Sequence, residues 1–295
     1  MKFNSYHPTI NLIYFASAIG FTIRFNHPIF LVISYMAAFA YSVKLKGLKS
    51  LVFNLCLVPL IILYAIWYSY YNHFGVTGLR RNFAGNEITL EAIVFGLVIG
   101  ITAAAVVMWM SCVFEVFSSD KLVYLFGRVS PKLSLFFSIL LRSVPRIKQT
   151  TVKINLARSG MGRGSRQGNI LCRLRNCLSI FSMVITWTME SFILSSRSMR
   201  SRGYSLKGRT AFSIYRFDNR DRGFVIAIFL CLTLMMMAIM LNQVTIHYDP
   251  MIIMNRITRV SYVFYIAYGV FLLMPMGLQI VGEAAFKRRC RQRWK

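Results

Sequence analysis

Two short motifs centred on arginine are the residues of this sequence best suited to binding chemistry. They are Ala157-Arg158-Ser159 and Ser201-Arg202-Gly203, and each lies at or near the end of a pattern typical of a helix. An arginine side chain is planar, permanently charged and able to donate paired hydrogen bonds to a carboxylate. Small residues on either side of the arginine let the backbone of a partner approach closely. We therefore predict that both motifs dock into grooves of partner proteins.

Other residue types that carry chemistry do not form a recognisable site in the sequence. The four histidines and six cysteines are scattered, and Cys172 and Cys177 lack the spacing of a metal site. The run GMGRGS at 160–165 has the glycines of a phosphate cradle, but no Lys-Ser or Lys-Thr pair follows it. We expect no catalytic residue, metal or cofactor in this chain, and no ATP hydrolysis by it.

Glu87 and Glu91 form the one pair of carboxylates at helical spacing that we considered for acid–base chemistry. They stand beside a loop, at the start of a long apolar stretch. Acidic side chains in that position complement the positive end of a helix. We favour this second interpretation.

The composition is that of an integral membrane protein. Of the 295 residues, 56% are hydrophobic and only 15% are charged. The 35 Lys and Arg against 9 Asp and Glu would suggest nucleic-acid binding in a soluble protein. Here the basic clusters lie between and after apolar stretches, as cytoplasmic loops do under the positive-inside rule. We therefore expect contact with membrane lipid and no nucleic-acid partner.

Six apolar stretches predict six membrane spans, although the first two are near the lower limit of length. They cover residues 10–23, 28–43, 51–71, 90–117, 224–241 and 260–280. The dense basic clusters at 44–49, within 118–222 and at 287–295 then share one side of the membrane. We predict a multi-pass protein of the cell membrane with both termini in the cytoplasm.

The spans divide the chain into three regions. Residues 1–117 hold the first four transmembrane helices, residues 118–222 form a cytoplasmic helical region, and residues 223–295 hold the last two spans and a basic tail. The predicted fold is an all-α integral membrane protein with about six transmembrane helices plus long cytoplasmic amphipathic helices. Within the middle region, Pro145 is expected to start a helix that ends at the glycines of 160–164.

A second helix of the middle region carries a stripe of residues at spacings of three and four. The stripe consists of Leu171, Leu174, Leu178, Phe181, Ile185, Thr188 and Phe192. Arginines flank it on both sides, so a span here would require one arginine cluster to cross the membrane. Polar residues such as Glu190 also interrupt it. We predict an amphipathic helix at the cytoplasmic interface, not a span.

Motifs along essentially the whole chain resemble those of one family. The pairs His7-Pro8 and His27-Pro28 are followed by SSDKLVYLFGRVSPKLSL at 118–135, LRSVPRIKQ at 141–149 and SMRSRGYSLKGRT at 198–210. This order is similar to that of the transmembrane T component of energy-coupling factor (ECF) importers, EcfT, in the CbiQ-like family.

The resemblance implies a subunit that is not an enzyme. In that family the T component is a membrane scaffold whose long cytoplasmic helices are coupling helices. Two arginine motifs insert into grooves of two ATP-binding-cassette (ABC) ATPases, which bind the ATP. A separate small membrane protein captures the vitamin or metal ion, and the scaffold couples ATP hydrolysis to the movement of that protein.

The resemblance also implies which residues dock. Arg202, within Ser201-Arg202-Gly203, matches the second motif of the family closely. For the first motif, Ala157-Arg158-Ser159 matches the family in composition. When the two are aligned by position along the helix, however, the family motif falls on the glycines that follow residue 159. Gly162-Arg163-Gly164 is therefore the second candidate for the first docking motif.

Two other classes of function stay open at this point. A membrane enzyme acting on lipid phosphates would use the basic surface to gather head groups, although the central stretch lacks an evident nucleophile, metal cluster or paired acids. A secondary transporter would place ionisable residues within its spans, and these spans are nearly bare of them. The arginines would then bind anionic lipid instead of protein partners.

Overall fold

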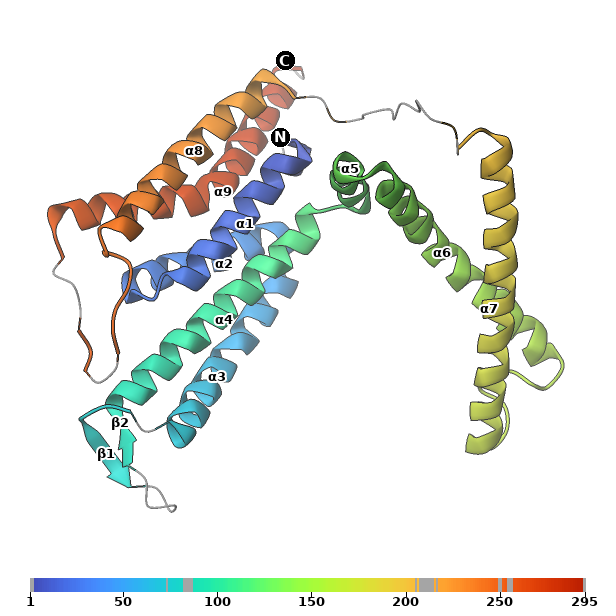
Figure 1. Cartoon of the computed structure of the whole chain (residues 1–295), viewed down its shortest axis with the longest axis horizontal. Helices are drawn as coiled ribbons and strands as arrows, with labels where there is room; N and C mark the ends of the chain where they lie inside the picture. The colour runs from blue at the N-terminus through green and yellow to red at the C-terminus, as the bar shows by residue number, and fades with distance from the viewer. Residues whose placement is uncertain are drawn as a thin grey trace. The chain divides into compact units, whose positions relative to one another are not determined.

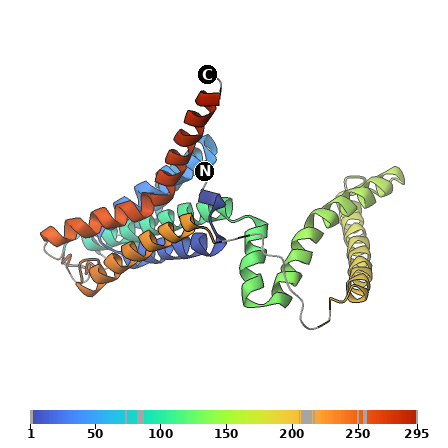
Figure 2. The ribbon, with the colours of Figure 1, turned by 90° about the horizontal axis from the view of Figure 1, so that it is seen from above.

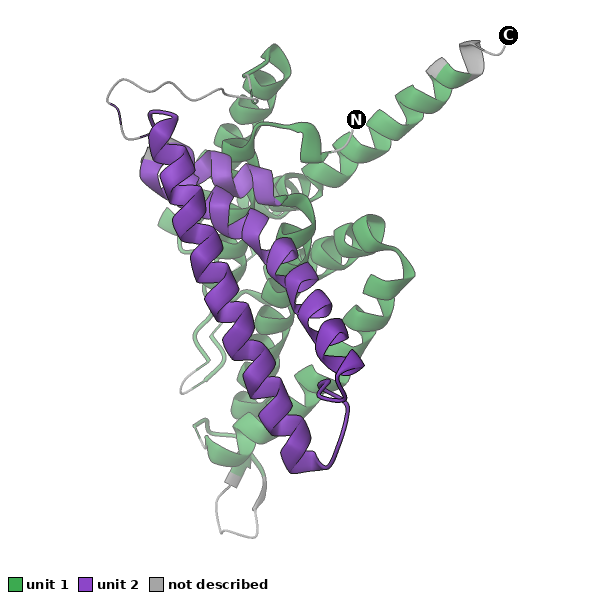
Figure 3. Ribbon diagram, turned by 90° about the vertical axis from the view of Figure 1, so that its right-hand side faces the viewer, with its two compact units in different colours: residues 1–118, 215–295 green, residues 119–214 purple. Residues whose placement is uncertain are grey.

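The structure is a computed structural model that describes residues 3–72, 74–81, 87–204, 206, 215, 217–248, 251–253 and 257–293. These residues form nine α-helices and one short strand hairpin. The helices belong to two compact units (Figure 3). We call residues 1–118 with 215–295 the membrane unit, and residues 119–214 the basic unit. The basic unit falls within the 118–222 region expected from the sequence.

The membrane unit holds six of the helices (Figure 1). They are α1 (Pro8–Arg24), α2 (Pro28–Lys46), α3 (Leu48–Tyr71), α4 (Leu90–Val116), α8 (Asn219–Met240) and α9 (Arg259–Arg293). A 3₁₀ turn at Phe3–Ser5 precedes α1, and the antiparallel strands β1 (Gly78–Arg81) and β2 (Glu87–Thr89) join α3 to α4. The last helix contains Pro275 and bends along its length (Figure 2), as expected where proline removes an internal hydrogen bond.

The two His-Pro pairs begin the first two helices in the same way. Nδ1 of His7 accepts a hydrogen bond from the backbone N–H of Thr9 at 3.4 Å, and Nδ1 of His27 accepts one from Ile29 at 3.3 Å. The proline that follows each histidine is the first helical residue, where its missing N–H costs nothing. These motifs therefore set where α1 and α2 start.

The core of the membrane unit is aromatic. Trp109, Tyr14, Tyr41 and Tyr268 are completely buried, and the cluster around them draws on α1, α2, α4, α8 and α9. The Tyr14 hydroxyl donates to the backbone carbonyl of Leu272 at 2.9 Å, which ties α1 to α9. Nε1 of Trp109 likewise donates to the Ser34 hydroxyl at 3.4 Å, and such bonds help to set one arrangement of the helices.

The basic unit consists of α5 (Ser119–Val129), α6 (Pro131–Gly160) and α7 (Ile170–Ser201). The two long helices, α6 and α7, form an antiparallel hairpin (Figure 3). The predicted start of α6 at Pro145 is wrong. Ser130 is the N-cap residue, Pro131 is the first helical residue, and Pro145 lies inside the helix. A proline can stand there because the 30-residue helix loses only the bonds local to it.

Six helices among the described residues are long and apolar enough to cross a membrane. They are α2, α3, α4, α7, α8 and residues 259–288 of α9. The chain is accordingly an all-α, multi-pass membrane protein.

The six candidate spans differ from the six predicted spans at two helices. The expected span at residues 10–23 lies in α1, whose 17 residues extend about 26 Å, less than the hydrocarbon core of about 30 Å. Helix α7, which was not predicted to be a span, is long and apolar enough to be one. The position of α7 at the membrane interface stays a prediction.

Candidate functional site

The first long helix of the basic unit, α6, ends in a Schellman motif built on Gly162. The N–H of Gly162 donates to the carbonyl of Ser159 at 3.1 Å, and the N–H of Arg163 donates to the carbonyl of Arg158 at 3.0 Å. Gly162 has φ +73°, a conformation that glycine adopts without a steric penalty. The prediction that glycines end this helix is confirmed.

The second long helix, α7, ends in the same way. The N–H of Gly203 donates to the carbonyl of Arg200 at 3.1 Å, and the N–H of Tyr204 donates to the carbonyl of Met199 at 3.3 Å. Gly203 has φ +78°, and Arg202 is the C-cap residue just before it. Each arginine motif thus belongs to the end of a long helix.

The arginines of the two motifs occupy different positions in these helix ends. Arg202 directly precedes the left-handed glycine, Gly203, whereas Arg158 lies four residues before its own, Gly162. Arg163 directly follows Gly162. The residue of α6 that corresponds to Arg202 is Met161, the C-cap of that helix.

Arg158 is buried in the contact between α6 and α7. It is 9% exposed, and its Nη1 donates to the Ser179 hydroxyl at 2.5 Å and lies 3.7 Å from the sulfur of Met183. Its Nε has no hydrogen-bond partner among the described residues. Arg158 therefore holds the hairpin together in this structure. Ser179 and Met183 carry no motif of their own, so nothing in the sequence pointed to them.

Arg163 and Arg202 are both exposed. Gly164, the small residue after Arg163, is buried, and a Cβ atom there would lie 2.9 Å from the Cβ of Ser159. Ser201, the small residue before Arg202, donates its hydroxyl to the carbonyl of Ser198 at 2.8 Å. The side chains of both exposed arginines are available to a partner.

The two motifs stand at opposite ends of the hairpin. Arg158 contacts α7 at Met183, and Arg202 ends α7 nineteen residues further along the chain. At the helical rise of 1.5 Å per residue, this separates the two motifs by about 28 Å. Two partner proteins can therefore bind one at each end.

The predicted stripe of α7 is largely exposed. Leu171 is 81% exposed and Phe181 is 63% exposed, whereas Ile180 and Val184 are the buried residues of the helix. The residues packed toward α6 lie roughly 100° around the helix from the stripe. Within the basic unit the hairpin leaves most of the stripe uncovered, and an apolar surface of this kind is typical of a contact with lipid or protein.

The two acidic residues considered as a pair lie in different elements, since Glu87 belongs to strand β2 and Glu91 to the first turn of α4. Glu91 accepts hydrogen bonds from the hydroxyl of Thr77 at 2.7 Å and from its N–H at 3.3 Å. Glu91 therefore links the loop at Thr77 to the first turn of α4. The side chain of Glu87 lies outside the described part of the structure.

Metal-binding residues do not gather in the described part of the chain, where no group of three or more His, Cys, Asp or Glu side chains is close enough to hold an ion. A comparison of the sequence with protein-family models finds no match, and neither does a comparison with curated proteins. The resemblance to ECF T components thus rests on the sequence motifs quoted above.

Proposed function

We propose that this chain is the transmembrane scaffold subunit, or T component, of an ECF-type importer in the cell membrane. The observation that carries the proposal is the position of the arginine motifs at the two ends of one helical hairpin, where about 28 Å of α7 separates Arg202 from the contact of Arg158 with Met183. Two ABC-type ATPases would each receive one motif. This chain itself hydrolyses no ATP in the proposed complex.

Arginine chemistry supports this docking. A guanidinium that enters a groove can form two parallel hydrogen bonds to one carboxylate, which sets direction as well as strength. A rigid hairpin between two such contacts turns a change in the distance between the ATPases into a movement of its helices. That movement is the coupling step of the proposed importer.

Exposure decides which arginines we assign to docking. Arg202 is exposed at the end of α7, and Arg163 is exposed at the end of α6. Arg158 would have to give up its hydrogen bond to Ser179 before it could enter a groove. We therefore assign the first docking contact to Arg163 and keep Arg158 as the second candidate.

The uncovered surface of α7 supports contact with a further membrane protein. Leu171, Leu174, Leu178 and Phe181 are each at least 60% exposed along one side of the helix. A small substrate-binding membrane subunit that captures a vitamin or metal ion would cover this surface. Both termini of the scaffold would lie in the cytoplasm with the ATPases.

The test is affinity purification of the tagged full-length protein in mild detergent, followed by identification of the copurifying chains and an assay of ATP hydrolysis. We expect two related ATPases with the wild type. Arg202→Glu should lose one of them, and Arg163→Glu should lose the other, because each carries its own contact. Arg158→Glu is measured beside them.

Lys148→Glu is the control that makes the same change of charge, because Lys148 is exposed in the middle of α6, away from both motifs. It should retain both ATPases. A wild-type protein that is folded but copurifies with no ATPase would contradict the proposal. Loss of an ATPase with Arg158→Glu but not with Arg163→Glu would return the first contact to Arg158.

A further inference from the structure

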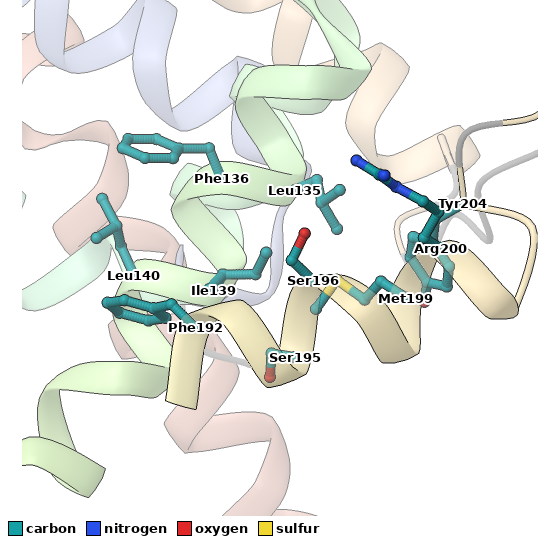
Figure 4. Close-up of a pocket in the computed structure, with 10 residues that line it drawn as sticks. All are labelled: Leu135, Phe136, Ile139, Leu140, Phe192, Ser195, Ser196, Met199, Arg200 and Tyr204. Carbon is teal, nitrogen blue, oxygen red and sulfur yellow. The ribbon is translucent and has the colours of Figure 1, made fainter. Parts of the chain in front are cut away.

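Two adjoining cavities lie between α6 and α7 within the basic unit. The first, of about 440 Å³, is lined mainly by apolar side chains (Figure 4). These are Leu135, Phe136, Ile139, Leu140, Phe192 and Met199. The second cavity, of about 390 Å³, shares six lining residues with the first: Leu135, Ile139, Phe192, Ser195, Met199 and Tyr204. We call them the apolar cavity and the polar cavity.

The polar cavity is strongly basic. Arg142 and Arg146 line it from α6, Arg202 lines it from α7, and no Asp or Glu is among its described lining residues. Arg142 and Arg146 are four residues apart on one face of a helix, where like charges repel each other. The whole basic unit contains 17 Lys and Arg but only two acidic residues, Asp120 and Glu190. This excess of positive charge attracts anions from outside the unit.

The chemistry of the two cavities selects an anion with an apolar tail. Guanidinium groups match the oxygens of a phosphate, and the hydroxyls of Ser138 and Ser195 line the same polar cavity. The apolar cavity beside it has the size of a typical ligand pocket. Its lining is apolar apart from Ser195, Ser196, Arg200 and Tyr204, so it suits an acyl chain better than a free phosphate. We propose that the two cavities together bind one anionic phospholipid. Its phosphate would lie among Arg142, Arg146 and Arg202, with an acyl chain in the apolar cavity.

This inference does not rest on the proposed function, since it needs only the hairpin of α6 and α7. The two share Arg202, which lines the polar cavity and also belongs to the second docking motif. The tests are separate because lipid binding is measured on this chain alone, without ATPases. Arg202 is for that reason left unchanged in the lipid experiment.

The experiment measures how much phospholipid stays bound to the full-length protein in a neutral detergent, by native mass spectrometry. Phosphatidylglycerol and phosphatidylcholine with identical acyl chains are added in turn, and inorganic phosphate is the probe for a free anion. We expect the wild type to retain phosphatidylglycerol at least fivefold more than phosphatidylcholine. The double variant Arg142→Gln/Arg146→Gln should lose this preference.

The matched control is Arg166→Gln/Arg175→Gln, which removes the same charge from exposed positions outside both cavities. It should retain phosphatidylglycerol as the wild type does. Ser196→Trp fills the apolar cavity from a residue that does not line the polar one, and it should also lose the bound lipid. This variant keeps the test decisive if the arginine variant does not fold.

Three results would overturn the proposal. One is equal retention of the two lipids by the wild type, and another is unchanged retention of phosphatidylglycerol by both cavity variants. The third is binding of inorganic phosphate that displaces the lipid completely and that Ser196→Trp leaves intact, which would indicate a site for a free anion.

Discussion

At the scale of single residues, the two arginine motifs are alike in composition and different in environment. Arg202 is exposed at the cap of its helix, whereas Arg158 donates to Ser179 from a buried position. This difference in burial has a simple cause. Arg158 lies four residues before its glycine, about one turn inside the helix, and there it faces the neighbouring helix. A hydrogen bond from a charged group stabilises a fold more than a neutral one does.

We predict that Arg158→Ala loosens the hairpin of the basic unit. The variant removes the charge-assisted bond to Ser179 and the packing against Met183, which together stabilise the contact by about 1.5–3 kcal/mol. Amide hydrogen exchange, read by mass spectrometry on residues 150–185 in detergent, should become correspondingly faster.

Arg202→Ala is the comparison for this prediction. Its exchange over residues 150–185 should match that of the wild type, because Arg202 lies at the other end of α7. If Arg158→Ala exchanged no faster than Arg202→Ala, the buried bond would contribute nothing to the hairpin. Arg158 would then be free to dock.

At the scale of elements, short polar motifs determine where helices start and end. Asp218 and Asp221 form a capping box, so α8 begins at Asn219, earlier than the span expected at residue 224. His27 caps α2 and lies in the core, with its Nε2 3.5 Å from the Tyr265 hydroxyl. Each cap supplies a hydrogen-bond partner to backbone N–H groups that the helix leaves unpaired.

We predict that the cap at His27 makes the membrane unit less stable in mild acid. Burial lowers the pKa of His27 below its ordinary value of 6.5. The unfolded chain therefore binds a proton more readily than the folded chain, and stability falls as the pH drops below about 6.5. The melting temperature in detergent should decrease from pH 7.5 to pH 5.5.

His27→Asn separates this effect from the other titrating groups. Asparagine keeps an oxygen that can cap α2, but it does not titrate. The melting temperature of the variant should fall less than that of the wild type over the same pH range. Equal losses in the two proteins would assign the acid sensitivity to other groups.

At the scale of the whole molecule, the membrane position of α7 decides the topology. Counted by length and apolarity, α7 joins the candidate spans, while its flanking arginines favour the cytoplasmic interface. A helix at the interface leaves both of its ends on one side of the membrane. A crossing helix would separate the ends and reverse the direction of α8 and α9.

Cysteine labelling distinguishes these topologies. Cys172 and a Ser198→Cys substitution are 26 residues apart on α7, or about 39 Å, which exceeds the hydrocarbon core. Each is kept as the single cysteine in a variant whose other cysteines are serine. We predict that a membrane-impermeant maleimide labels both positions in inside-out vesicles and neither in intact cells.

Asn72→Cys is the control for the opposite side, because residue 72 follows α3 and is expected outside the cell. It should be labelled in intact cells. Labelling of Cys172 and Ser198→Cys from opposite sides would make α7 a span and would contradict the interfacial prediction.

The sequence by itself determined the fold class and most helix ends, because these depend on local properties. Apolar length predicts membrane helices, and the glycines after residue 160 end α6, whereas the caps at His7 and His27 were found only in the structure. Local reasoning was wrong about Pro145, since a proline is a strong signal of a helix start and only the full helix shows that it lies inside. The span expected at residues 10–23 lies in α1, which at 17 residues is the shortest of the six expected spans.

Only the tertiary structure decided which surfaces are used and which are free. The sequence placed the stripe of α7 on one face, but the hairpin packs through Ile180 and Val184 instead. It offered Arg158 and Arg163 as alternatives, and the contact with Ser179 buried the first and left the second exposed. The physical reason is that packing depends on how a neighbouring helix approaches, and this approach brings together residues far apart in the chain.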